Sequence, residues 1–212
     1  MSRNVMAALV AAGALAVSAC GATTFNTTWK NPDAQMIHVQ PGEKILAMVI
    51  SQNESVRRGA EAALASELSR NGAVGVPAYT VIPDDAVQDQ NKAKPYIDKS
   101  GASYAVIMRA TGREKEVSST PTMGGYYGPG WGGYGGFYGG FYGYGWGGAW
   151  GGSQIRTDTI VFVETLVYDL KSDKMVWAGQ SETLNPSKAD GMVKELVDEA
   201  ANEMRKQGLL PS

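Results

Sequence analysis

The sequence predicts an α/β (α+β) fold: a single mixed sheet with helices packed on it. Two observations support this. Apolar, strand-like segments alternate with helical segments in the first half, and a strand pair followed by an amphipathic segment ends the chain. Strands joined through helices pair in parallel, whereas strands joined by a tight turn pair antiparallel. The expected order is β-α-β-α-β, then a glycine- and aromatic-rich insert, then β-β-α, in one domain over 44–212.

The first strand and helix follow directly from the apolar pattern. Residues 44–51 (KILAMVIS) form a near-continuous apolar run, which is typical of a strand covered on both faces. Apolar residues then recur every four positions from Val56 to Leu68, so one helical face is buried. Asn53 or Ser55 is expected to cap this helix at its N-terminus.

Two further strands and one weak helix complete the first half. Residues 74–79 are expected to form a strand at or near a sheet edge, because Pro77 has no N–H to donate. Residues 89–100 have a weak helical pattern, which Pro95 either kinks or restricts to one short turn. Residues 102–111 are apolar at their centre and predict the third strand.

The second half predicts a central strand, a hairpin and a long helix. Both faces of residues 155–169 are partly apolar, so this strand is expected at the centre of the sheet. A turn at 169–174 lets 175–183 pair back on it. Apolar residues with a 3.6-residue period over 189–204 predict the last helix, which Gly208 ends.

The N-terminus has the pattern of a secretory signal. An apolar segment of 5–18 follows Arg3 and is too short to cross a bilayer comfortably. Small residues then precede Cys20, and the run Val-Ser-Ala-Cys resembles the lipobox of bacterial lipoprotein signals. The resemblance implies that 1–19 is removed and that Cys20 carries acyl chains such as palmitate. The alternative is an ordinary secretory signal with cleavage near Ala19 or Ala22.

Lipidation also accounts for the cysteine itself. Cys20 is the only cysteine, so it forms no internal disulfide, and acylation removes a free thiol from an oxidising compartment. Gly21, rather than Asp, follows it, which resembles the outer-membrane address of Gram-negative lipoproteins. Residues 20–43 are expected to form a lipidated anchor and tether that holds the domain in the envelope, on the outer membrane and facing the periplasm.

The tether has two notable properties. Its 22 residues, 21–42, reach roughly 75 Å when fully extended. Within it, Phe25, Thr27 and Trp29 alternate with polar residues, so part of the segment is expected to add to the sheet as an edge strand.

The insert of 123–152 has an unusual composition. Sixteen of its thirty residues are glycine and eleven are aromatic, and no charged residue occurs between Glu116 and Arg156. Because strands precede and follow it, we expect an oversized loop that joins two neighbouring strands of one sheet. The candidate contact residues are Tyr126, Tyr127, Trp131, Tyr134, Phe137, Tyr138, Phe141, Tyr142, Tyr144, Trp146 and Trp150.

Three interpretations of the insert remain open. It is a low-complexity loop without function, a segment that contacts the membrane interface, or a platform for a partner protein or glycan. Ordering so many glycines costs backbone entropy, which favours the first interpretation. Trp and Tyr favour the headgroup zone of a bilayer, which favours the second. An uncharged aromatic tract also predicts self-association at high concentration.

The remaining charged and polar residues point away from an enzyme. The net charge is −2 and no basic run occurs, so nucleic acid is not an expected partner. His38 is the only histidine and lies in the tether without neighbours for catalysis or metal binding. No cofactor, metal or catalytic residue is expected. Arg57 and Arg58 either hold an anion or form a solvated helix face, and Arg109 and Glu164 either pair across the sheet or lie exposed.

Several short motifs occur in order along the chain after Cys20. They are Thr28-Trp29-Lys30-Asn31-Pro32, Val56-Arg57-Arg58, Val76-Pro77-Ala78-Tyr79 before Ile82-Pro83, Gly101-Ala102, and Tyr168-Asp169 before Trp177-Ala178-Gly179-Gln180-Ser181-Glu182-Thr183. With them, the chain resembles uncharacterised bacterial lipoproteins of the domain-of-unknown-function 4136 kind or a near relative. The resemblance implies an envelope-facing α/β domain and brings no catalytic residues.

The sequence therefore predicts a non-enzymatic, membrane-anchored envelope lipoprotein. Its domain acts as a binding or structural module, and its insert contacts the membrane or an unidentified envelope partner. The alternatives are a self-assembling structural or stress-related envelope protein and, with little support, an enzyme with an unrecognised site.

Overall fold

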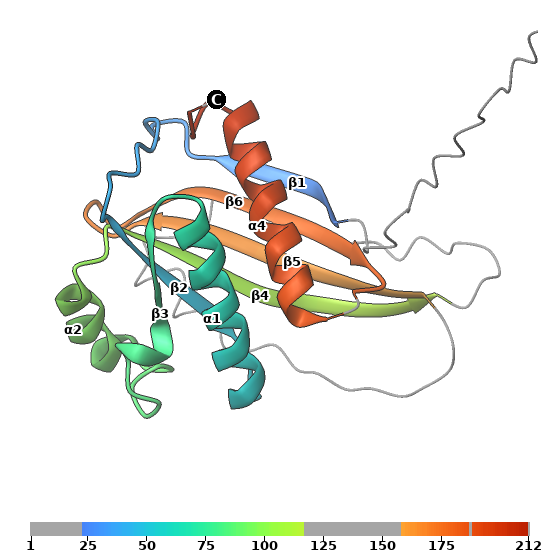
Figure 1. Cartoon of the computed structure of the whole chain (residues 1–212), viewed down its shortest axis with the longest axis horizontal. Coiled ribbons are helices and arrows are strands. Elements are labelled where there is room, and N and C mark those ends of the chain that lie inside the picture. The colour runs from blue at the N-terminus through green and yellow to red at the C-terminus, as the bar shows by residue number, and fades with distance from the viewer. Residues whose placement is uncertain (1–22, 117–157, 187, 212) are drawn as a thin grey trace, which may run out of the picture.

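The computed structural model describes residues 23–116, 158–186 and 188–211, whose strands form one six-stranded mixed sheet (Figure 1). The strand order is β1-β6-β5-β4-β2-β3, and three α-helices pack against the sheet. The predicted α+β class and single mixed sheet are therefore confirmed. The elements are β1 (Thr23–Lys30), β2 (Lys44–Ile50), α1 (Glu54–Arg70), β3 (Val74–Pro77), the 3-10 turn η1 (Ala78–Thr80), α2 (Gln90–Ser100), β4 (Tyr104–Glu116), β5 (Asp158–Asp169), β6 (Lys174–Leu184) and α4 (Ala189–Lys206).

The directions of the strands follow from their connections. β2 pairs in parallel with both β3 and β4, because α1 and α2 lie in the crossovers. β5 pairs antiparallel with β4 and with β6, so it is central, as predicted. β3 is an edge strand and contains Pro77. β4 and β5 are neighbours, so the insert joins two adjacent strands of one sheet.

The alternation of Phe25, Thr27 and Trp29 correctly predicts an edge strand. These residues lie in β1, which pairs antiparallel with β6 at the other edge of the sheet. Phe25 packs edge-on against the buried Trp177, with ring centroids 5.4 Å apart. Gly179 lies beneath this aromatic pair and leaves room for it.

α2 is longer than a single turn, although Pro95 lies inside it. Asp89 caps the helix by accepting hydrogen bonds from the N–H groups of Asn91 and Lys92. Ala93 and Ile97 are buried on one face of the helix. The cap and this apolar face therefore keep the segment helical past the proline.

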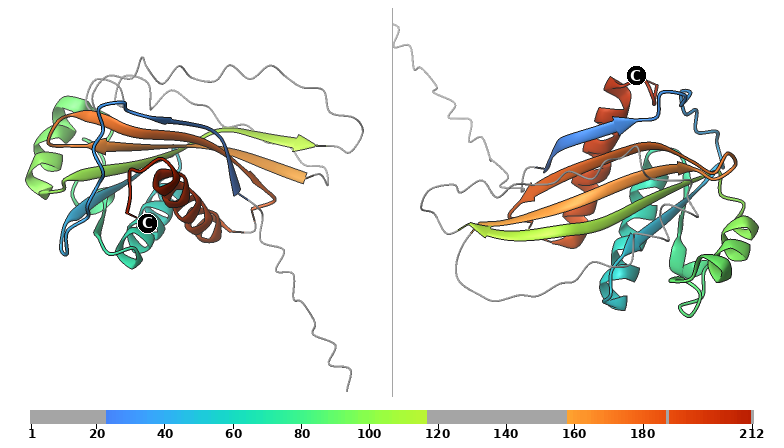
Figure 2. Two further views of the ribbon diagram at one scale, coloured as in Figure 1. Left: turned by 90° about the horizontal axis from the view of Figure 1, so that it is seen from above. Right: turned by 180° about the vertical axis from the view of Figure 1, so that it is seen from behind.

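The sheet has apolar residues on both faces, and different helices cover them. α1 and α4 lie side by side on one face, as the view from above shows (Figure 2). The segment 78–100, which includes α2, packs on the other face over the start of β4 and the end of β5. The largest fully buried side chains are Trp177, Tyr168, Leu46, Met48, Leu64, Ile82, Ile97, Ile107, Leu166 and Leu196.

Candidate functional site

The site residues predicted from the sequence lie outside the described residues. Cys20 precedes them, and the eleven aromatic residues from Tyr126 to Trp150 fall between 116 and 158. The structure does describe the strand ends that lead to the Cys20 segment and to the insert.

Both segments join the sheet at the same end. Thr23, the first residue of β1, pairs with Thr183 near the end of β6, and Thr183 pairs with Val161 near the start of β5. Val161 in turn pairs with Arg113, three residues before β4 ends at Glu116. β1 and β4 are separated by three strand spacings, roughly 15 Å. The start of β1, the tip of β4 and the start of β5 lie together at the right of Figure 1.

The connection between Cys20 and the sheet is short. Cys20 precedes Thr23 by three residues, which span about 11 Å at full extension. The segment 21–42, expected as a long tether, is therefore largely part of the domain. β1 takes up 23–30, and farther on Ile37 is buried and donates its N–H to the carbonyl oxygen of Leu209.

Hydrogen bonds hold this end of the sheet in place. Asn185 follows β6 with a positive φ of 49°, and its N–H donates to the carbonyl oxygen of Thr159. The N–H of Thr159 donates back to Oδ1 of Asn185 at 2.8 Å. Beside them Leu184, the last residue of β6, has 43% of its side chain exposed. This end of the sheet is thus held by hydrogen bonds between β5 and Asn185, and it presents an apolar side chain to the outside.

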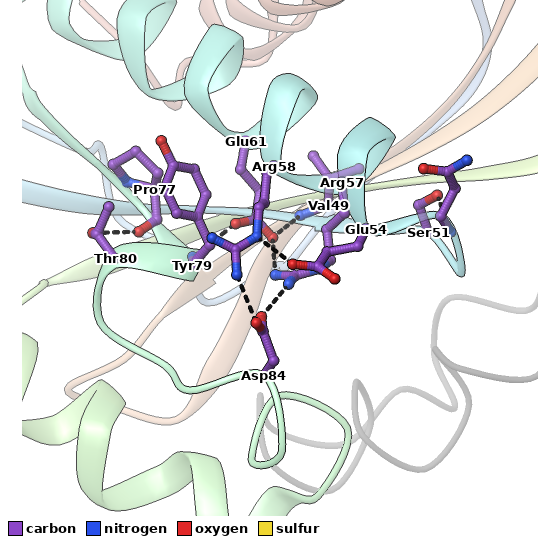
Figure 3. Close-up of polar contacts among 11 residues, drawn as sticks. Val49, Ser51, Glu54, Arg57, Arg58, Glu61, Pro77, Tyr79, Thr80 and Asp84 are labelled. Atoms are coloured by element: carbon purple, nitrogen blue, oxygen red, sulfur yellow. Dashed lines mark hydrogen bonds and ion pairs between the residues drawn. The ribbon is translucent and has the colours of Figure 1, made fainter.

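The two arginines of α1 hold a carboxylate of the same chain (Figure 3). Nη2 of Arg57 lies 2.6 Å from Oδ1 of Asp84, and Nη2 of Arg58 lies 2.6 Å from Oδ2 of the same carboxylate. Asp84 therefore bridges the two arginines. Arg57 is only 4% exposed, whereas Arg58 is partly exposed and stacks on the ring of Tyr79. Arg57 and Arg58 were expected either to bind an anion or to form a solvated helix face. The structure agrees better with anion binding, and the anion is the carboxylate of Asp84.

A buried glutamate completes this cluster, called here the arginine–glutamate cluster (Arg57, Arg58, Glu61, Asp84). Glu61 is 1% exposed and lies 3.4 Å from Nη1 of Arg57. Its two oxygens also accept the backbone N–H groups of Val49 and Tyr79. The carboxylate therefore links β2, α1 and η1, while Asp84 links α1 to the following loop.

Burial and hydrogen bonding shift the two carboxyl groups in opposite directions. Burial raises the pKa of Glu61, although hydrogen bonds from Tyr79 and Arg57 oppose the shift. Burial also acts to raise the pKa of Asp84, but the hydrogen bonds from Arg58 and Arg57 outweigh it and lower that pKa. Since every partner comes from the domain itself, the cluster holds the fold together.

Of the two alternatives left open for Arg109 and Glu164, the structure shows the pairing across the sheet. They occupy paired positions on β4 and β5, and Nε of Arg109 donates to Glu164, which is fully buried. Gln180 pairs with Glu164 from β6 and is itself 3% exposed. A row of polar side chains therefore crosses the centre of the sheet.

An apolar cavity lies between the sheet and the two helices that cover it. Its volume is about 260 Å³. Its wall comes from β2, β4, β5, α1 and α4, with the segments at 37–39 and 210–211 closing it. One buried polar side chain, Thr165, lies on this wall. The sequence gives no signal for the cavity, because Thr165 has the ordinary alternation of a β-strand.

Within 23–116, 158–186 and 188–211, no group of three His, Cys, Asp or Glu residues is placed to hold a metal ion. No helix in these ranges is long and apolar enough to cross a membrane. His38 is exposed on the segment between β1 and β2.

No family model matches the chain, and no curated protein matches it. Solved structures with a similar arrangement include a PelC dodecamer from Paraburkholderia phytofirmans. It is 10% identical with a TM-score of 0.43, over 82% of this chain and 96% of that one. Another is lipoprotein GNA1162 from Neisseria meningitidis, 16% identical with a TM-score of 0.39, over 78% and 99%. These similarities are distant, so the proposals below rest on the residues of this chain.

Proposed function

We propose that this protein is a lipid-anchored lipoprotein of the bacterial envelope, on the outer membrane and facing the periplasm. It acts without enzymatic activity, as a binding or structural module whose glycine- and aromatic-rich insert contacts the membrane surface. The observation that supports this proposal best is the shared sheet end, because β1 begins three residues after Cys20 and the insert leaves and re-enters there. Membership of the domain-of-unknown-function 4136 family is part of the same proposal and rests on the sequence motifs.

The short connection determines what the insert can reach. Two or three acyl chains on Cys20 contribute about 0.8 kcal/mol per buried methylene, which is enough for stable anchoring. Thr23 then lies within about 11 Å of the anchored residue, and the attachment points of the insert lie roughly 15 Å across the sheet. The described strand ends that lead to and from the insert, Glu116 and Asp158, therefore lie close to the headgroup zone, which Trp and Tyr prefer. This placement favours the membrane over a distant partner as its contact.

Four variants test the proposal: the wild type, Cys20→Ala, deletion of 123–152, and both changes together. After cell fractionation, we expect Cys20→Ala to leave the membrane fraction and the deletion variant to stay in it. With anionic lipid vesicles, purified Cys20→Ala protein is expected to bind weakly and the doubly changed protein not at all. Thermal unfolding checks that the deletion leaves the domain folded.

Two results would contradict this account. If Cys20→Ala fractionates with membranes as the wild type does, Cys20 is not the anchor. If both non-lipidated variants bind vesicles equally, the insert is not a membrane contact. Concentration-dependent oligomers that the deletion abolishes would instead favour a self-assembling envelope protein.

A further inference from the structure

The apolar cavity has a buried apolar wall and an open mouth with polar residues. Its interior is formed by buried side chains of the sheet and α4, among them Met108, Val167 and Val197. Arg205 and Asn71 line it as well and are exposed, so they mark its mouth. The mouth residues are engaged locally: Arg205 donates to Asn202, and Asn71 donates to the carbonyl oxygen of Glu67.

Thr165 differs from these polar groups. It is 1% exposed and lies on the cavity wall, and its Oγ1 has no hydrogen-bond partner among the described residues. Burying a hydroxyl without a partner is costly, so such groups are rare in folded proteins. A valine has nearly the same shape and would avoid this cost.

Thr183 provides a comparison within the same sheet. It is also 1% exposed and lies on the neighbouring strand β6, away from the cavity. Its Oγ1 lies 2.9 Å from Oγ1 of Thr23, so its hydroxyl is satisfied. Thr165 and Thr183 are thus equally buried, but only the hydroxyl of Thr165 is open, and only Thr165 borders the cavity.

We propose that the cavity binds a small, mainly hydrocarbon molecule whose single hydroxyl or carbonyl group hydrogen-bonds to Oγ1 of Thr165. The volume limits the size of this ligand. A dry apolar cavity of about 150 Å³ accommodates benzene, so 260 Å³ corresponds to about ten non-hydrogen atoms. The apolar wall takes the hydrocarbon body, and the buried hydroxyl selects molecules that carry one polar group.

The cavity lies away from the anchor end of the sheet. Tyr104 lines it at the start of β4 and pairs with Asp169 at the end of β5, whereas Cys20 joins the sheet at the opposite ends of these strands. The ligand therefore enters from the side that faces away from the anchor. This site is separate from the proposed membrane contact, and its test does not depend on lipidation.

The test uses 2-naphthol and naphthalene, which differ by one hydroxyl group, with the Cys20→Ala protein and variants made in it. We expect 2-naphthol to bind about 3- to 10-fold more tightly than naphthalene, the ratio that one hydrogen bond supplies. Thr165→Val is expected to remove this preference and to raise the unfolding temperature. The matched control Thr183→Val is expected to keep the preference and to lower the unfolding temperature, because it removes the buried hydrogen bond between the hydroxyls of Thr183 and Thr23.

Filling the cavity tests the location of the site. Ala200→Leu places extra carbons in the cavity from α4, and both probes are expected to lose binding by at least about tenfold. Ala201→Leu, at a half-exposed position, is the second blocking variant if Ala200→Leu unfolds. Three results would overturn the proposal: no binding of either probe, equal binding of both to the parent protein, or binding that neither blocking variant reduces.

Discussion

A Glu61→Ala variant is expected to lose about 3–5 kcal/mol of unfolding free energy, which approaches the whole stability of many domains. The substitution removes the acceptor of two partly buried backbone N–H groups, those of Val49 and Tyr79. It also removes one of the two carboxylates that pair with the buried Arg57 and leaves the other, Asp84, which is half exposed. Urea unfolding followed by circular dichroism measures the loss.

A comparison with an exposed glutamate of the same helix separates the effect of burial from that of charge. Glu54→Ala removes an exposed partner of Arg58 in the same helix and is expected to cost less than about 1 kcal/mol. A Glu61→Ala loss as small as this would mean that the arginine–glutamate cluster does not hold the domain together.

The raised pKa of Glu61 determines the direction in which stability changes with pH. Since burial raises its pKa in the native protein, the stabilisation linked to the protonated carboxyl is complete below the unfolded-state pKa. It declines as pH rises through the raised native-state pKa. The stability of the wild type relative to Glu61→Gln is therefore expected to fall across this interval of rising pH, and an increase would contradict it.

A Gly179→Ala variant is expected to lose about 1–3 kcal/mol and to loosen β1 from the sheet. A Cβ atom at this position would lie 2.4 Å from Cη2 of Trp177 and 2.6 Å from Cε1 of Phe25. Both rings must then move, and this disturbs the edge-on contact between Phe25 and Trp177, which helps to attach β1 to β6. Thermal unfolding measures the loss, and limited proteolysis reports whether β1 becomes accessible.

Gly191→Ala is the matched control for this substitution. Gly191 lies in α4, and a Cβ atom there meets nothing within 4 Å. Alanine in a helix is expected to stabilise by roughly 0.5–1 kcal/mol relative to glycine. If both substitutions have the same small effect, close packing at Gly179 is not what attaches β1.

The fold was largely predictable because its signals are local. The apolar run of β2, the four-residue period of α1 and the alternation in β1 each determine an element from neighbouring residues. Pro77 identifies an edge strand for the same reason, since its missing N–H acts at its own position. Pro95 shows the limit of such local signals. Proline disfavours a helix interior, but the cap at Asp89 and the burial of one face of α2 outweigh this preference.

The sites were less predictable because they depend on distant partners. Asp84 follows a turn in the sequence, and only the fold brings it to Arg57 and Arg58. Thr165 has the pattern of an ordinary strand residue, so its open hydroxyl is visible only once the cavity is known. The edge strand within 21–42 was predictable from its alternation, whereas the packing of Ile37 depends on the distant Leu209.

The orientation of the sheet on the membrane is the central claim and can be measured directly. Cys20 is the only native cysteine, and the proposed lipidation blocks its thiol, so in the lipidated form that we propose an introduced cysteine is the single labelling site. Leu184→Cys places a fluorophore at the anchor end of β6, and Ser172→Cys places one in the turn before β6, about 35 Å away along the strand. In vesicles with nitroxide-labelled lipids, we expect strong quenching at position 184 and little at 172. Equal quenching at both positions, or stronger quenching at 172, would contradict the proposed orientation.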